Sequence, residues 1–450
     1  MDNTVYVVHC IDTEGPLYES IESVFDRLNS TFGTEFKPSI QVLEQLQKQQ
    51  IDLKGNEKAV SDFLDPQRLK TNETWCQIDE MLDRITKKEF RQKYCDSFGG
   101  GWIYNWFCLD YVGYNGINPR RRDVGPHNIF DHYRLYNKIN SIEDDLIQWH
   151  YHPLAIIKDL NKSGTTYLNS SNVHEILARK IIDRMWFPAA FRPGFHTERP
   201  DSNWFLEQWI PFDYANQSTK DNKENQPDLL NQRFGDWRNA STSWVPYNPD
   251  IYNYQKIGNC RRLIARCLNM DARIRELTKN DISDAFCEAQ EKGAALLAFT
   301  DHDFRDIEYD VNKVGSMIKD VSGQYSNVKF KYVNAIEGIR KVMNLNNRDR
   351  PDFTLDIERF KNLSTFYVKS KNDIFGVQPF LAIKTKTNQY FWENFDFEGK
   401  NSWSYTFDYA NININAVEKI GVAANTMSGV TEIGLLDVDS NRATTSVLNS

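Results

Sequence analysis

Two histidines separated by a single residue, His150 and His152, follow a short apolar run at residues 146–149. The run predicts a strand, and Pro153 comes directly after the second histidine. Side chains two positions apart on a strand point to the same face, so both imidazoles can approach one ion. Imidazole nitrogen suits zinc and similar divalent metals, and a catalytic zinc site often has three protein ligands. The pair indicates a metal site that needs a third ligand; two hydrogen-bonded histidines at a strand end are the alternative.

Two carboxylates follow the first apolar run of the chain, residues 5–11. This β-branched run predicts a buried strand, and Asp12 and Glu14 come at its carboxyl end, before a Gly-Pro turn. Because they are spaced two apart, the carboxylates share a face, so one can bind a metal while the other transfers a proton. A polar strand end with a capping acid is the alternative interpretation.

Polar side chains also mark the ends of later strands. Arg192 follows the strand predicted at residues 186–191 and precedes Pro-Gly, a rigid exposed bend whose guanidinium can hold a carboxylate or a substrate oxygen. His302 stands between two aspartates after the strand predicted at residues 294–299. A histidine flanked by acids is a good proton-transfer group, because an acid can fix its tautomer and raise its basicity. Asp213 lies on another short predicted strand.

Strand and helix patterns alternate from residue 5 to about residue 340, and charged side chains collect at the strand ends. This alternation predicts an α/β fold, a barrel or a sheet of mainly parallel strands. The carboxyl ends of such strands can meet in one cleft. The candidate side chains fall on five different predicted strands, each near its end, and they are Asp12, Glu14, His150, His152, Arg192, Asp213 and His302.

Two segments depart from the alternation. Residues from about 18 to 100 include a polar, helix-like stretch, which predicts a helical insertion. After about residue 345, short β-prone runs are separated by Asn, Gly and Asp, which predicts β structure. With 450 residues the chain is long enough for more than one domain. We expect a barrel domain at 1–344 and a C-terminal β-rich domain or subdomain at 345–450.

Bulk properties narrow the class of protein. A net charge of −8 gives no reason to expect nucleic acid as a partner. No stretch approaches the roughly 20 apolar residues of a membrane span, and the N-terminus lacks the basic region of a secretory signal. The seven cysteines are scattered and contain no Cys-x-x-Cys pair, which argues against a disulfide framework or a zinc ribbon. A reduced, cytoplasmic setting is the simplest expectation.

The order of these strand-end residues resembles that of the NodB-like polysaccharide deacetylases, carbohydrate esterase family four, and most of all its divergent members found with surface-polysaccharide biosynthesis. The resemblance covers residues 4–340 and implies a distorted (β/α) barrel. On this resemblance Asp12 matches the catalytic base and Glu14 the acidic metal ligand of the first motif. His150 and His152 match the two metal histidines. The family usually has Asp in place of Glu14, and its histidines are three or four residues apart.

The resemblance also assigns the remaining candidates. Arg192, with the proline after it, matches the Arg-x-Pro motif whose arginine orients the base, although here no residue separates the two. Asp213 matches the acid of the fourth motif, and His302 the late histidine that serves as general acid. The implied reaction is hydrolysis of an N-acyl amide on a sugar, assisted by one divalent metal, with zinc the expected ion.

Aromatic side chains near these strand ends are candidates to stack on a sugar ring: Trp149, Tyr151, Trp204 and Trp209, with core packing as the alternative. A cytoplasmic setting would favour a nucleotide-linked or lipid-linked sugar precursor as substrate over finished wall polymer, and an oligosaccharide is a further possibility. The sequence leaves the oligomeric state open.

Two other functions remain open. Residues 300–303, Thr-Asp-His-Asp, and the His-x-His pair resemble motifs of PHP-type metal-dependent phosphoesterases, although that family opens with His-x-His on its first strand. The other hypothesis is a carbohydrate-binding or scaffold protein with a degenerate site, which the unusual histidine spacing favours. Metal content distinguishes the binding or scaffold hypothesis from the two enzyme hypotheses. Hydrolysis of amide or of phosphoester substrates distinguishes the two enzymes from each other.

Overall fold

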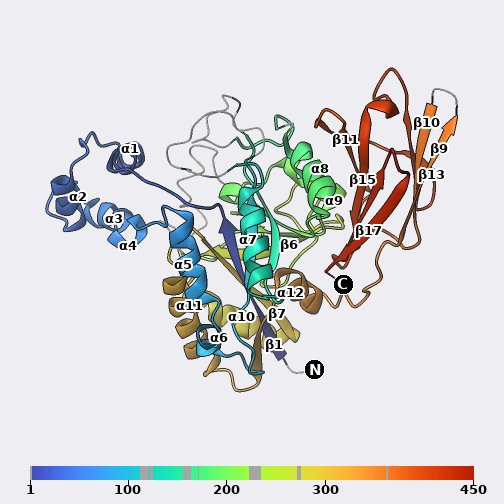
Figure 1. Ribbon diagram of the computed structural model, residues 1–450. Coiled ribbons are helices and arrows are strands. Elements are labelled where there is room, and N and C mark those ends of the chain that lie inside the picture. The colour runs from blue at the N-terminus through green and yellow to red at the C-terminus, as the bar shows by residue number, and fades with distance from the viewer. Residues whose placement is uncertain are drawn as a thin grey trace.

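The computed structural model in Figure 1 places a helical unit, a central barrel and a β-rich unit side by side. It describes residues 3–111, 121, 125–154, 156, 164–170, 172–221, 235–270, 275–360 and 363–449.

Within the described residues, seven parallel strands close into a barrel. Each strand pairs with the next from β2 to β7, and β1 closes the ring between β7 and β2. β8 pairs with the first half of β1, while β2 pairs with its second half. The sheet contains these seven strands and β8, and its strands are β1 (Asn3–Thr13), β2 (Tyr104–Leu109), β3 (Leu146–Tyr151), β4 (Ala190–Pro193), β5 (Phe212–Asn216), β6 (Leu263–Asn269), β7 (Ala294–His302) and β8 (Val328–Tyr332). The predicted α/β barrel is confirmed.

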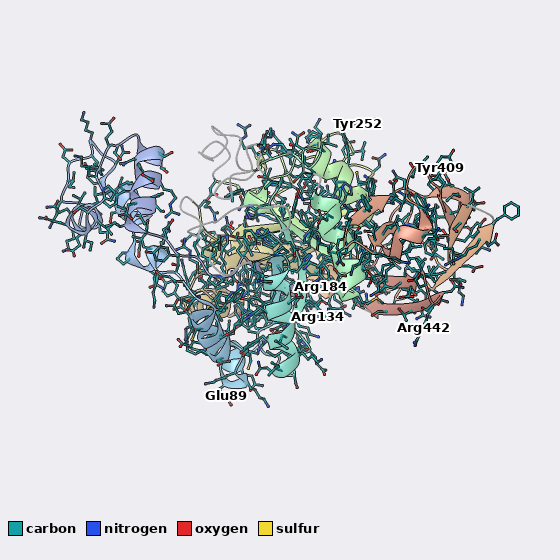
Figure 2. The ribbon with its side chains drawn as sticks, turned by 45° about the horizontal axis from the view of Figure 1, so that its top comes forward. Glu89, Arg134, Arg184, Tyr252, Tyr409 and Arg442 are labelled. Atoms are coloured by element: carbon teal, nitrogen blue, oxygen red, sulfur yellow. The ribbon has the colours of Figure 1, made fainter. Side chains whose placement is uncertain are left out.

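Helices cover the outside of the barrel, so its strands are buried on both faces and read as apolar runs. These helices are α7 (Asn128–Ile139), α8 (Asn172–Arg184), α9 (Pro200–Trp209), α10 (Lys279–Lys292) and α11 (Ile307–Ser322). The helix that follows β8 is α12 (Ala335–Val342). Arg134 of α7 donates to the carbonyl of Arg184 at the end of α8, and both are labelled in Figure 2. At the start of α12, Ala335 contacts Asn105 of β2 and Tyr214 of β5, so this helix packs into the inner core of the barrel.

The strand predicted at residues 186–191 begins only at Ala190. Pro188 lies inside the predicted run, and proline cannot donate a hydrogen bond to a neighbouring strand. Trp186 and Phe187 instead pack in the hydrophobic core outside the strand.

A helical insertion separates β1 from β2. Its elements are α1 (Ile21–Phe32), α2 (Ile40–Gln47), α3 (Glu57–Phe63), α4 (Pro66–Leu69), α5 (Trp75–Ile85), α6 (Lys88–Arg91) and a 3-10 turn η1 (Gln92–Tyr94). Helices α1 to α4 pack around a small core of their own, built on Phe25, Leu28 and Val60. In Figure 1 these four helices extend away from the barrel, whereas α5 and α6 lie along it.

The C-terminal part forms two antiparallel sheets, in the orders β13-β14-β10-β9 and β12-β11-β15-β16-β17. The strands are β9 (Phe353–Phe360), β10 (Leu363–Ser370), β11 (Phe380–Thr385), β12 (Tyr390–Glu393), β13 (Asp396–Gly399), β14 (Ser402–Phe407), β15 (Val417–Asn425), β16 (Thr431–Asp437) and β17 (Arg442–Leu448), with a 3-10 turn η4 (Ile414–Ala416) before β15. A shared core joins the sheets into a sandwich, with Phe366 on one side and Val422 on the other. The predicted C-terminal β structure is confirmed, whereas the domain boundary at residue 344 stays a prediction.

The sandwich packs on α8 of the barrel, where Phe380 and Ala423 belong to the same hydrophobic core as the barrel helices. Among the described residues, no helix has the length and apolar character that crossing a membrane requires. All seven cysteines are described, and all carry free thiols.

Candidate metal centre

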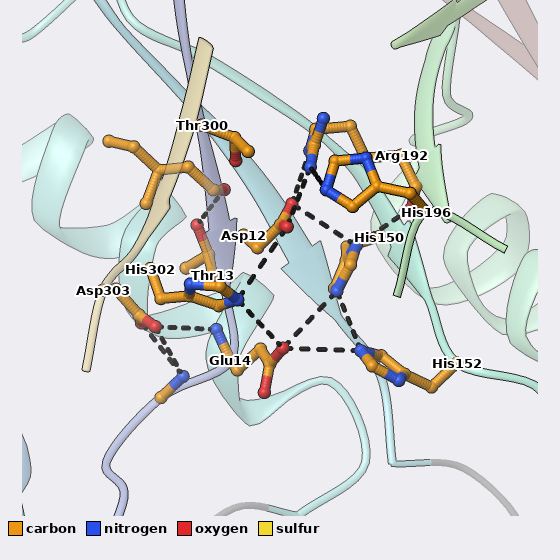
Figure 3. Close-up of polar contacts among 12 residues, drawn as sticks. Asp12, Thr13, Glu14, His150, His152, Arg192, His196, Thr300, His302 and Asp303 are labelled. Carbon is orange, nitrogen blue, oxygen red and sulfur yellow. Dashed lines mark hydrogen bonds and ion pairs between the residues drawn. The ribbon is translucent and has the colours of Figure 1, made fainter. Parts of the chain in front are cut away.

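The register of the barrel brings the strand-end residues together. Asp12 on β1 is the pairing partner of His302 on β7, and His150 on β3 is the partner of Arg192 on β4. Since all the barrel strands are parallel, these carboxyl ends open on one side of the barrel. Figure 3 shows the side chains converging there.

Three of these side chains form a compact triangle of potential metal ligands. The two Nε2 atoms of His150 and His152 are 3.0 Å apart, and Oε1 of Glu14 lies 3.6 Å and 3.4 Å from them. A tetrahedral zinc ion with ligands at about 2.0–2.2 Å requires ligand atoms about 3.3–3.6 Å apart. The two separations that involve Glu14 fall in this range, and the separation of the two histidines is shorter, at 3.0 Å. Two imidazoles with one carboxylate are a donor set that zinc accepts. The cluster could therefore hold a divalent ion.

Hydrogen bonding fixes the tautomer of one ligand. Nδ1 of His150 lies 2.9 Å from the carbonyl oxygen of Arg192, which can only accept, so Nδ1 carries the proton. In the neutral ring the lone pair is then on Nε2, the atom that faces His152 and Glu14. A partner of this kind orients a metal-binding histidine in many sites.

Glu14 is held at both ends. Its Oε2 accepts a hydrogen bond from Arg121, which leaves Oε1 facing the histidines. Burial alone would raise the pKa of Glu14, but the positive charge of Arg121 keeps this pKa well below its ordinary value. The side chain is therefore a carboxylate, the form that binds metal.

Asp12 is braced by a buried arginine. Nε and Nη2 of Arg192 donate to the two carboxylate oxygens of Asp12 at 2.6 Å and 3.0 Å. The same guanidinium donates to the carbonyl of Tyr214 at 2.6 Å and to the sulfur of Cys267 at 3.0 Å. Burial opposes ionisation of Asp12, yet Arg192 and His150 hold its pKa below the ordinary value. Asp12 is thus an ionised base in a fixed orientation.

His302 faces both carboxylates. Its Nε2 lies 4.0 Å from Oδ2 of Asp12 and 4.0 Å from Oε1 of Glu14, and a quarter of its side chain is exposed. Solvent can therefore reach the imidazole. Its ring also packs on Phe304, with centroids 4.7 Å apart.

His196 also lies among these strand-end residues, next to Arg192, although it was not among the residues predicted from the sequence. Its Nε2 lies 3.3 Å from Nη2 of Arg192 and 3.1 Å from Oδ1 of Asn269. Phe195 and His196 both have positive φ, an unusual backbone conformation that often occurs at functional sites. The signal in the sequence was its position two residues after the Arg-Pro-Gly bend.

Asp213 lies apart from the metal ligands. It pairs with Arg262, and Arg262 also binds Glu198, all three side chains being buried. Burial and the neighbouring Glu198 raise the pKa of Asp213 well above its ordinary value. The side chain takes part in a buried ion network at the start of β5, and its catalytic role stays a prediction.

The predicted sugar-stacking residues do not line the cluster. Trp149 and Tyr151 lie in the hydrophobic core, because alternation along β3 directs them away from the face that carries His150 and His152. Trp209 is also in this core. Trp204 is 44% exposed on α9, and its indole donates to the carbonyl of Ile251. These positions argue for packing in the first three cases.

No protein-family model matches this chain, and a search of curated proteins found no significant match.

Proposed function

We propose that this chain is a metal-dependent hydrolase of NodB-like type that removes an N-acyl, acetyl-like group from a sugar or a surface-polysaccharide precursor. One observation carries the proposal. The triangle of Glu14, His150 and His152 stands beside Asp12, a carboxylate that Arg192 holds ionised, and beside the accessible His302. A Lewis-acid site, a base and a second proton-transfer group together meet the requirements of amide hydrolysis.

The residues divide the work as follows. A divalent ion, proposed to be zinc, would activate water and polarise the amide carbonyl when bound by the triangle. Asp12 takes the proton from the attacking water, and Arg192 keeps that carboxylate in place. His302 gives a proton to the departing amine as the C–N bond breaks, so acetate and a free amino sugar are formed. The proposed substrate is a nucleotide-linked or lipid-linked sugar, or an oligosaccharide.

The first test is metal content. We expect about one zinc ion per chain in the purified protein, by elemental analysis, and loss of that ion in the double variant His150→Ala, His152→Ala. His132→Ala is the matched control, because His132 pairs with Asp79 at 2.7 Å, on helices outside the cluster. A protein that takes up no zinc would favour a binding or scaffold role instead.

The second test identifies the chemistry. We expect acetate release from N-acetylated sugars and no phosphate release from phosphoesters. His302→Ala should keep the metal, which it does not bind in this proposal, and lose roughly 10²–10⁴-fold in kcat, the range for a proton-transfer group. Phosphate release with no acetate release would assign the site to the phosphoesterase class.

A further inference from the structure

The two ends of the segment that carries α1 to α4, the first part of the helical insertion, meet beside the metal centre. The insertion leaves β1 just after Glu14, and the backbone N–H of Leu17 donates to the carbonyl of Asn72 at 2.9 Å. The N–H of Asn72 in turn donates to the carbonyl of Phe304 at 2.8 Å, in the turn that follows β7. Both ends of the segment from α1 to α4 are thus tied to the turn directly after His302.

The side chain of Asn72 strengthens this connection. Its Nδ2 lies 3.0 Å from the carbonyl oxygen of Asp303 and 3.0 Å from that of Arg305. One amide therefore spans the turn directly after His302. A turn secured at two carbonyls holds the preceding histidine at a defined position and orientation.

The side chain of Asp303 reaches across to the first strand end. Its carboxylate accepts hydrogen bonds from the N–H of Glu14 at 2.8 Å and from the N–H of Gly15 at 2.9 Å. The hydroxyl of Tyr133 donates to the same carboxylate at 3.0 Å. Gly15 has a φ of 73°, so the chain turns sharply right after the predicted metal ligand. Asp303 is fully buried, which excludes water from competing for these bonds.

We propose that Asp303 and Asn72 act as positioning residues, Asp303 for the metal ligand Glu14 and Asn72 for the proton donor His302. This inference rests on the proposed function. Together the hydrogen bonds of these two side chains connect the end of β1, the end of β7 and the segment around Asn72, which we call the base of the insertion. The insertion is therefore a structural part of the site: a shift at its base moves the segments that carry Glu14 and His302.

The two positions predict different defects. In Asp303→Asn an amide NH₂ faces a backbone N–H, so the segment of Glu14 loses one of its acceptors. Partners that orient a metal ligand typically contribute 10–100-fold in metal affinity, and we expect the dissociation constant for zinc to rise by about that factor. Tyr133→Phe, which removes one hydrogen bond to Asp303, should raise it less and in the same direction.

Asn72→Ala should affect the position of His302 and not that of Glu14. We expect zinc affinity close to that of the wild type, with kcat for acetate release reduced by about tenfold, because His302 loses its orientation. In Asn72→Asp a carboxylate oxygen replaces the NH₂ group and cannot donate to the two carbonyls. We therefore expect this variant to resemble Asn72→Ala.

Matched controls exist for both arms. Asp201 accepts the consecutive N–H groups of Tyr167 and Leu168, and Asn29 bridges the backbone of Phe36 within the insertion. We expect Asp201→Asn and Asn29→Ala to retain the zinc affinity and kcat of the wild type, with folding checked by circular dichroism.

The outcomes separate this inference from the proposed function. Wild-type protein that binds no zinc, or binds it and releases no acetate, contradicts the proposed function. Wild-type protein that binds zinc and releases acetate, with folded Asp303→Asn and Tyr133→Phe variants of unchanged zinc affinity, overturns the role of Asp303. Unchanged kcat in Asn72→Ala overturns the role of Asn72.

Discussion

Arginines set the charge balance of the metal centre, one for each carboxylate. Arg192 neutralises Asp12, and Arg121 neutralises Glu14 through the oxygen that points away from the histidines. Each carboxylate is thereby kept ionised in a buried setting, where an uncompensated charge would be costly. The carbonyl of Arg192 also orients His150, so a single residue contacts both the proposed base and a proposed metal ligand.

Gly194 packs so closely against the imidazole of His152 that no side chain fits at this position. A Cβ atom at this glycine would lie 2.4 Å from Nδ1 of the imidazole, well inside contact distance. We expect Gly194→Ala to displace His152 and to weaken zinc binding by at least tenfold, measured by competition with a chelator.

Gly323→Ala provides the comparison for that variant. A Cβ at Gly323 would meet only backbone atoms at 3.7 Å, at the end of α11, so its zinc affinity should equal that of the wild type. Equal affinities in all three proteins would show that His152 does not bind the ion.

At the scale of elements, α8 connects the barrel to the sandwich. One side carries Lys180, whose ammonium lies 3.0 Å from Asp110 at the end of β2, and both side chains are buried. Nδ1 of His127 lies 2.5 Å from the same carboxylate. Burial disfavours the charged form of Lys180 and lowers its pKa, while Asp110 partly offsets this effect. The ion pair fixes the helix against the strand.

Lys180→Met should destabilise the protein by about 3 kcal/mol, because it leaves the carboxylate of Asp110 buried with its charge partner removed. Chemical denaturation monitored by fluorescence measures the change. The double variant Lys180→Met, Asp110→Asn should recover at least half of the loss, since the buried charge is then gone. A double variant less stable than the single one would contradict this explanation.

At the scale of the whole molecule, the barrel and the sandwich share one hydrophobic core, so we expect them to unfold together. His174 of α8 lies at this junction, stacked on Trp392 with ring centroids 4.1 Å apart. Burial lowers the pKa of His174 from 6.5 to about 4. Below pH 6.5 His174 therefore binds a proton in the unfolded chain but stays neutral in the folded chain. The free energy of unfolding thus falls as the pH is lowered from 6.5 to about 4.

His174→Phe removes this titration and keeps a ring against Trp392. Between pH 7 and pH 4.5 we expect the variant to lose about 2 kcal/mol less stability than the wild type. Urea denaturation at the two pH values measures the difference. An identical loss in both proteins would show that the junction does not sense acid.

Local patterns were enough to predict an α/β fold of mainly parallel strands and the strand ends of the site, whereas they left a barrel and an open sheet as alternatives. A buried parallel strand needs a continuous apolar run, and the polar residue that ends it is visible in the chain itself, as at Asp12 and His150. Spacing by two also places His150 and His152 on one face. The same alternation directs Trp149 and Tyr151 to the opposite face, so their burial could have been inferred.

The partners of these residues were decided only by the tertiary structure. Glu14 and Asp303 are 289 positions apart, and their hydrogen bond depends on β1 lying next to β7 in the closed barrel. Asp213 was predicted near the end of its strand, yet it lies at the start of β5, where its carboxylate pairs with the buried Arg262. Spacing along a strand determines the face on which a side chain lies. Which distant residue meets it there depends on strand order and packing, which spacing does not record.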